Sequence, residues 1–540
     1  MLRNVLEDYL NSINERDFDY PLTALLQAMG FYDIHLTHGK TEFGKDFIAK
    51  KSVDSTLYQY SIQSKKGDIK QKAFRDEILG QLMEASLLGI GHPQFDRDLP
   101  RRVIFVATGR LVDNAALSFQ DMNLELSRKF EKNPVEFWGH ERLAELSEEF
   151  GLSGIHQNTI KGIRGFAQFY LVYSKAIEGN LSEREIEEYS CLWLDDSLDY
   201  KKRILRAAIE AEILAVKLIE GSHLYEATVV YLALARAVMD ATYQNDDPFV
   251  KEILAETMNA RLVPSCRRFL NELKSSWNEQ DKSLIHLCIR DSPFPMVHYL
   301  VWCARISEIA SLLFFLTDDP EEKANAISFL CEFIDKEPGA GHVPSDRYAI
   351  SVVWTALALM STNQVKEARH FVQKALVWLC DQVEKGFGLA RYEADEFEVT
   401  KALVGYPFEF IEVAKNRSSY LATVIADLAA FFGDAEFYSD VVNDIEACEI
   451  VYNYWQVPDT KAALFMINSA EVISYPNVPH QFSLDGESYA EHIKHEPDSF
   501  QIADTSGVGC LIILSILLRD RYFPKLWNRL AEQHGRSVAA

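Results

Sequence analysis

Three polar residues near the N-terminus have types and a spacing suited to phosphodiester chemistry. Asp46 follows the segment Glu42-Phe43-Gly44-Lys45, and Gln63 and Lys65 lie at the end of an apolar, alternating segment that begins at residue 57. Residues two apart on a β-strand share a face, so Gln63 and Lys65 should point the same way. Phosphodiester cleavage needs a metal that neutralises the phosphate and activates water, and a cation that steadies the developing charge. Asp46, Gln63 and Lys65 are therefore candidate catalytic residues.

The same segment offers oxygen ligands for a hard divalent cation. Mg²⁺ prefers carboxylate, amide and carbonyl oxygens, and Mn²⁺ accepts the same ligands. Asp46, the side-chain carbonyl of Gln63 and the backbone carbonyl of Ser64 can supply them. Gln-x-Lys alone carries little weight, because a chain of 540 residues should contain about one copy by chance. A second copy, Gln280-Asp281-Lys282, lies in a polar stretch without an upstream Gly-x-Asp, so we assign it to a solvated surface.

Four further cations follow the candidate site closely, and we expect them to contact nucleic acid: Lys66, Lys70, Lys72 and Arg75. Affinity for DNA comes largely from such contacts to phosphates. The cluster is equally compatible with a solvated turn and helix start. For the catalytic trio, the alternatives are a turn aspartate at residue 46 and a solvated edge strand guarded by lysine at residues 63 and 65.

The elements that must position these residues form an α/β unit over about 150 residues. The apolar spacing predicts helical structure within residues 4–29, interrupted near residues 16–20 and closed by Gly30. Short alternating segments then predict a strand meander at residues 31–37, 46–51 and 57–63. A helix at 73–88, a strand buried on both faces at 103–107, a helix at 113–130, a strand at 135–138 and a helix at 141–150 follow.

Beyond residue 151 the pattern predicts helices only. The clearest are residues 201–218, 224–241, 297–316, 348–360 and 365–383. Ala368, Val372 and Ala375 have the spacing of the second helix of a tetratricopeptide unit, although the preceding helix lacks the matching pattern. We expect a large all-α, helical-repeat-like region at residues 156–540, with a long irregular insertion at 474–507.

Charge and composition indicate where nucleic acid could bind. The net charge is −25, but residues 1–150 hold 19 Lys and Arg against 24 Asp and Glu, which leaves −20 on the remainder. We therefore expect nucleic acid to bind only to the N-terminal region. The charged N-terminal residues are incompatible with a secretory signal, and the longest apolar runs are typical of buried helices. The eight scattered cysteines are typical of a protein in a reducing compartment. We expect a cytoplasmic protein.

The N-terminal residues resemble the Mrr-type nucleases of the PD-(D/E)xK superfamily, which have the restriction endonuclease fold. The family's first helix is matched by Phe18-Asp19, Leu22, Leu25-Leu26 and Gly30-Phe31; its Gly-x-Asp block by Gly44-Lys45-Asp46; and its Gln-x-Lys strand by Gln63-Ser64-Lys65. The resemblance covers residues 15–110 well and 110–150 more loosely. Asp19 replaces the family's usual glutamate and is one methylene shorter; the resemblance assigns this position a part in metal binding or in orienting Lys65.

The resemblance implies a mixed central sheet flanked by helices at residues 1–155. It further implies a Mg²⁺-dependent nuclease that acts on double-stranded DNA through Asp46, Gln63, Lys65 and Asp19. It also implies a regulated effector of a prokaryotic restriction or antiphage system. The acidic helical region repels duplex DNA, so we expect it to act as an oligomerisation or partner-binding module. RNA remains an alternative substrate. The alternative function is a helical-repeat interaction scaffold whose nuclease-like domain is vestigial or only binds nucleic acid.

Overall fold

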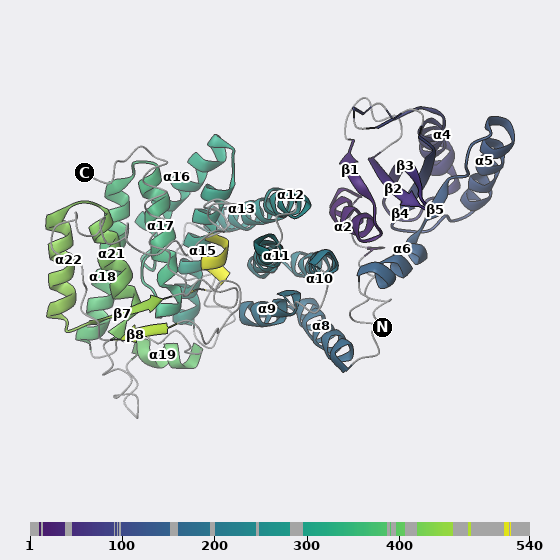
Figure 1. Cartoon of the computed structure of the whole chain (residues 1–540). Coiled ribbons are helices and arrows are strands. Elements are labelled where there is room, and N and C mark those ends of the chain that lie inside the picture. Colours follow the sequence, from purple (N-terminus) through teal and green to yellow (C-terminus); the bar gives the residue numbers. More distant parts are fainter. Residues whose placement is uncertain are drawn as a thin grey trace. The chain divides into compact units, whose positions relative to one another are not determined.

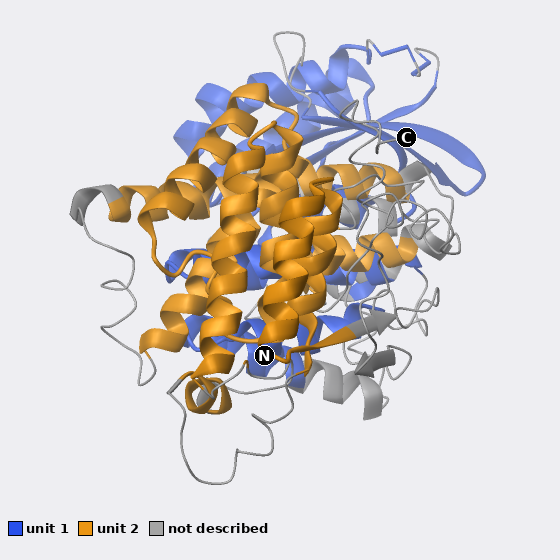
Figure 2. Ribbon diagram, turned by 90° about the vertical axis from the view of Figure 1, so that its left-hand side faces the viewer, with its two compact units in different colours: residues 1–230 blue, residues 231–540 orange. Residues whose placement is uncertain are grey.

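The computed structural model describes residues 10–11, 15–37, 46–90, 92–93, 95–96, 99–151, 160–194, 200–244, 248–280, 295–385, 389, 396–404, 418–456, 473–476, 512–517 and 519. Contacts divide the chain into two compact units, Met1–Val230 and Tyr231–Ala540, coloured separately in Figure 2. Unit 1 therefore contains the α/β region and the first helices that follow residue 155. Each unit is described by itself.

Unit 1 contains a mixed sheet of five strands in the order β1-β2-β3-β4-β5 (Figure 1). The strands are β1 Tyr32–Leu36, β2 Phe47–Val53, β3 Thr56–Lys65, β4 Arg101–Ala107 and β5 Glu136–Trp138. The first three pair antiparallel as a meander, while β3, β4 and β5 pair in parallel. The predicted meander and the predicted central strand are confirmed, since β4 has a neighbour on each side and is buried from Val103 to Ala107.

The helices that follow β3 and β4 cover one face of this sheet. The segment after β3 forms α3 (Gln71–Ala73), a π-helical stretch (Phe74–Ile78) and α4 (Leu79–Leu87), and α5 (Ala115–Phe130) follows β4. Side chains of α4 and α5 pack on Val103, Phe105 and Ala107, which share one face of β4. On the other face, Phe31 contacts Tyr60 and Trp138, with ring centroids 4.8 and 6.5 Å away. Helix α6 (His140–Leu146) and a π-helical turn (Ser147–Gly151) close the α/β region.

Helix α2 (Glu15–Ala28) corrects one prediction and confirms another. The expected break at residues 16–20 is wrong, because the helix runs through them and buries Phe18 in line with Leu22 and Leu26. The predicted end at Gly30 is confirmed. Gly30 has φ +88°, and the Phe31 N–H donates to the Leu26 carbonyl (3.0 Å), which closes the helix as a Schellman motif.

The helical part of unit 1 is held together by a buried carboxylate. It comprises α8 (Ile160–Glu178), α9 (Glu183–Ser190), a 3₁₀ turn (Cys191–Leu194), α10 (Tyr200–Glu220) and the start of α11 (Leu224–Gln244). Glu210 accepts hydrogen bonds from Tyr189 Oη (2.6 Å), Trp193 Nε1 (2.7 Å) and Arg206 Nε (2.9 Å). Helix α10 also packs against α2, which joins this helical part to the α/β region.

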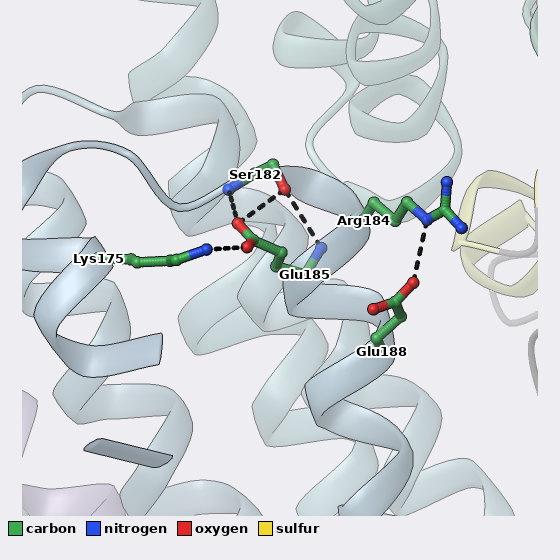
Figure 3. Close-up of polar contacts among 5 residues, drawn as sticks. All are labelled: Lys175, Ser182, Arg184, Glu185 and Glu188. Atoms are coloured by element: carbon green, nitrogen blue, oxygen red, sulfur yellow. Dashed lines mark hydrogen bonds and ion pairs between the residues drawn. The ribbon is translucent and has the colours of Figure 1, made fainter. Parts of the chain in front are cut away.

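The N-terminus of α9 is fixed by a capping box (Figure 3). The Ser182 side chain accepts from the Glu185 N–H (3.4 Å), while Glu185 Oε2 accepts from the Ser182 N–H (3.1 Å). Glu185 also accepts from Lys175 of α8. Burial alone would raise the pKa of Glu185, but the hydrogen bonds from Lys175 and Ser182 outweigh it and lower that pKa.

We predict that Glu185→Gln lowers stability in a pH-dependent way. A carboxylate with a depressed pKa stabilises the fold above its unfolded value of about 4.5, and that contribution is lost as the pH falls through the folded value. The variant should lose a few tenths to about 1 kcal/mol at neutral pH. The melting temperatures of the two proteins, measured between pH 3 and 7, should converge toward pH 3. Glu188→Gln, which only breaks the exposed pair with Arg184, is the control, and a constant difference across the range would contradict the prediction.

Unit 2 is mostly helical, as predicted. Its helices, with the remainder of α11, are α12 (Pro248–Glu256), α13 (Val263–Gln280), α15 (Pro295–Leu316), α16 (Pro320–Lys336), α17 (Ala349–Ser361), α18 (Val365–Glu384), α19 (Glu396–Val404), α21 (Tyr420–Phe431) and α22 (Ala435–Ala447). The spacing of Ala368, Val372 and Ala375 marks a packing face, since all three are fully buried on α18. Among the described helices, α15 alone is long and apolar enough to cross a membrane, and 78% of its most apolar window is buried.

The expectation that strands end at residue 151 is wrong. A small sheet joins β6 (Ser418–Ser419), β7 (Val451–Gln456) and β8 (Ile473–Pro476). Strand β7 reads Val-Tyr-Asn-Tyr-Trp-Gln, and such aromatic and β-branched residues favour strands. The start of the expected 474–507 insertion belongs to β8, and residues 477–507 lie outside the described part of the chain.

Candidate active site

The strand register brings Asp46 opposite Gln63. Phe47, the first residue of β2, pairs with Ile62 of β3, so the preceding Asp46 faces Gln63 across the antiparallel pair. The Asp46 N–H donates to the Ile62 carbonyl (2.9 Å), which extends the ladder by one residue. Side chains at opposed positions share a face, and the parallel register puts Gln63 beside Phe105. Asp46 and Gln63 therefore lie on the face that α4 and α5 cover.

The Asp46 carboxylate is held by two hydrogen bonds from the end of β3. Its Oδ2 accepts from Gln63 Nε2 (2.6 Å) and from the Ser64 N–H (2.7 Å). Because one donor is a main-chain amide and the other belongs to a strand residue, the carboxylate is oriented by the rigid part of the sheet. The structure thus brings together three of the residues that the sequence selects, namely Asp46, Gln63 and Ser64.

The Gln63 side chain fits an oxygen-preferring cation. Gln63 is 2% exposed, and its Oε1 is buried without a hydrogen-bond partner. A buried hydrogen-bond acceptor without a partner destabilises the folded state by about 1–3 kcal/mol. A ligand that binds Gln63 Oε1 would remove this penalty. A carboxylate, an amide oxygen and a nearby main-chain carbonyl form the donor set that Mg²⁺ and Mn²⁺ accept. The residues present therefore fit the metal expected from the sequence.

Lys65 ends β3 on the same face as Gln63, and its backbone is fixed by the neighbouring strand. The Lys65 carbonyl accepts from the Thr108 N–H (3.1 Å), and Thr108 Oγ1 accepts from the Gly67 N–H (2.8 Å). Gly109 follows, where a Cβ would come within 2.3 Å of the Gly67 main chain. Sequence reasoning missed Thr108 and Gly109, although a Thr-Gly pair directly after a buried parallel strand is a detectable signal for a close loop contact.

The four predicted DNA-contacting cations follow the end of β3. Lys66 lies directly after the strand, Lys70 precedes α3, Lys72 lies within α3, and Arg75 lies in the π-helical stretch. All four side chains are exposed. Two exposed acids on the same helical segment, Asp76 and Glu77, accompany them, so this surface is basic without being uniformly so.

Asp19 lies on α2 and is half-buried. Its main-chain carbonyl accepts from Thr23 Oγ1 (2.8 Å). Its side chain is not a member of the hydrogen bonds that join Asp46, Gln63 and Ser64. Residues 42–45, which complete the predicted Gly-x-Asp block, lie outside the described residues. The second Gln-x-Lys copy begins at Gln280, the last residue of helix α13, and so lacks the strand end that positions Gln63.

Comparisons with protein families, curated proteins and solved structures find no match. Within the described residues, no three His, Cys, Asp or Glu side chains gather as a metal site would require. A site built from one carboxylate, one amide and one main-chain carbonyl is of a different kind. The assignment of this site therefore depends on its own geometry.

Proposed function

We propose that this chain is a metal-dependent endonuclease of the restriction-endonuclease-like class that hydrolyses DNA phosphodiester bonds. The observation that supports it most is the pairing of Asp46 with Gln63 and Ser64 at the end of β3, with Gln63 Oε1 unpartnered and Lys65 two residues further along the same face. The resemblance of the motifs to those of Mrr-type nucleases supports the same function. It also suggests a role as a regulated effector in prokaryotic restriction or antiphage defence.

Each residue has a distinct part in this proposal. Asp46, Gln63 and the Ser64 carbonyl would hold Mg²⁺ or Mn²⁺, which supplies charge neutralisation at the phosphate and a more acidic water. Lys65 stabilises the negative charge that develops on the phosphate, since a positioned cation acts most strongly where charge grows in the transition state. The Ser64 N–H keeps the Asp46 carboxylate in place.

The exposed cations that follow β3 would bind DNA and take no part in the reaction itself. Lys66, Lys70, Lys72 and Arg75 are exposed cations within ten residues of Lys65, and their charges suit the sequence-independent contacts that hold a nucleic acid backbone. Lys66 adjoins the catalytic strand, so DNA held there would lie beside Lys65. Asp19 is a further candidate for the site, through water or through Lys65.

A substrate panel tests the proposal. The purified full chain and its Lys65→Ala variant are incubated with supercoiled, linear, single-stranded and modified DNA, and with RNA, in Mg²⁺ and in Mn²⁺. We expect cleavage of DNA that Lys65→Ala lowers by about 10²-fold or more. Lys129→Ala is the matched control, because Lys129 is an exposed lysine of α5 that pairs with Glu125. Equal cleavage by wild type and Lys65→Ala, or none of any substrate, would favour the scaffold alternative.

A further inference from the structure

A second polar site lies at the other end of β3. A cavity of about 340 Å³ opens where β3 and β4 begin, beside the ends of α4 and α5. Gln59, Arg101 and Val103 line it from the sheet. Gln59 pairs with Arg101 in the parallel register and lies four residues before Gln63, about 13 Å along the strand. The cavity is therefore distinct from the Asp46 site.

Gln59 forms the buried wall of this cavity. The residue is 2% exposed, and its Nε2 is buried without a hydrogen-bond partner. A side-chain amide carries both donors and an acceptor. Its main-chain N–H donates to the Pro100 carbonyl (2.9 Å), which fixes the strand at this position, and Gln59 is one of the residues that line the cavity. Gln59 Nε2 therefore lacks a hydrogen-bond acceptor, which a ligand in the cavity can supply.

Arg101 brings a half-buried positive charge to the same cavity. Its guanidinium donates to two main-chain carbonyls, those of Leu88 and Ser86 (3.0 Å for Ser86), and no carboxylate of the described residues pairs with it. Burial lowers the pKa of Arg101. Such a cation is stabilised by an anionic ligand.

The rim limits the size of that anion. Lys132 adds a second cation at the exposed edge, whereas Asp96 and Glu131 add two carboxylates. This balance disfavours a polyphosphate and suits a single phosphate group. A volume of about 340 Å³ falls at the lower end of small-molecule sites and is larger than a bare phosphate would fill.

We propose that this cavity binds a nucleoside monophosphate, with the phosphate on Arg101 and Lys132 and the base edge on Gln59. A nucleobase edge offers both donors and acceptors, so it complements a side-chain amide in either orientation. The inference does not depend on nuclease activity, because it concerns a separate cavity and a binding event without metal.

Calorimetry of the full chain in EDTA tests this site, with deoxyadenosine monophosphate, inorganic phosphate and deoxyadenosine as probes. We expect one equivalent of the monophosphate to bind, and phosphate and nucleoside to bind at least about 10-fold more weakly. Arg101→Met should weaken binding about 10-fold or more, since a charge-assisted hydrogen bond is lost. Arg102→Met is the matched control, because the Arg102 guanidinium stacks over Tyr58 (4.1 Å) instead of lining the cavity.

A second variant keeps the test decisive if Arg101→Met is unstable. Lys132→Ala changes only an exposed rim residue and should weaken the monophosphate at least about threefold, by loss of one phosphate contact. Absence of monophosphate binding to the wild type at millimolar concentration would overturn the proposal. Equal binding by wild type and both variants would overturn it as well.

Discussion

The Asp46→Asn variant is expected to cleave DNA at least about 10³-fold more slowly than the wild type in Mg²⁺. Asparagine keeps the shape of the side chain and an oxygen that can accept from the Ser64 N–H, so the end of β3 should stay in place. It lacks the negative charge that a divalent cation requires at this position. The rate should therefore fall while the fold is retained.

The Asp54→Asn variant is the matched control. Asp54 is exposed in the turn between β2 and β3 with φ +48°, a conformation that asparagine tolerates well. Initial rates on the best substrate of the panel should be unchanged by this substitution. Cleavage by Asp46→Asn within about tenfold of the wild type would exclude Asp46 from the chemistry, since a lost metal ligand costs several kcal/mol in transition-state stabilisation.

The Arg519→Met variant is expected to destabilise unit 2 by about 3–5 kcal/mol. Arg519 and Glu308 are both completely buried, and Arg519 Nη1 lies 2.8 Å from each carboxylate oxygen of Glu308. The guanidinium also lies 5.0 Å from the Tyr348 ring centroid. Removing the arginine leaves a carboxylate buried in α15 without its counter-ion, which is the costly way to break a buried pair.

The double variant Glu308→Leu with Arg519→Met separates charge from packing. It removes both charges, so most of the lost stability should return. Urea denaturation followed by tryptophan fluorescence gives the stability of each protein. Lys385→Ala, which breaks an exposed pair with Asp381, should change it by less than about 1 kcal/mol. A double variant no more stable than Arg519→Met would show that the loss is one of packing.

The α/β region could be read from the sequence to a large extent because its elements carry local signals. The continuous apolar run of β4 and the alternation of β2 and β3 predicted the central part of the sheet, and Gly30 predicted the end of α2. The expected break in α2 is absent. Phe18 is flanked by polar residues at 15–17 and 19, and its burial depends on tertiary packing that the local sequence does not show. Strand β7 was missed because single strands among helices have weak periodicity.

The candidate site shows the same division between local and tertiary information. Residue types and spacing could place Asp46, Gln63 and Lys65 at adjoining strand ends. They could not show that Asp46 accepts from the Ser64 N–H, because that bond depends on the register of β2 against β3. The cavity at Gln59 and Arg101 was beyond reach as well, since its walls come from strands and helix ends far apart in the chain.

Calorimetric titration of the metal-free full chain with Mn²⁺ tests the central claim most directly, because it measures the cation that Asp46 and Gln63 are proposed to hold. The wild type should bind Mn²⁺ at this site. Asp46→Asn and Gln63→Met should abolish that binding, and Asp54→Asn should preserve it. Unchanged Mn²⁺ binding by Asp46→Asn and Gln63→Met, or no binding by the wild type, would contradict the assignment of these strand ends as a metal-dependent nuclease site.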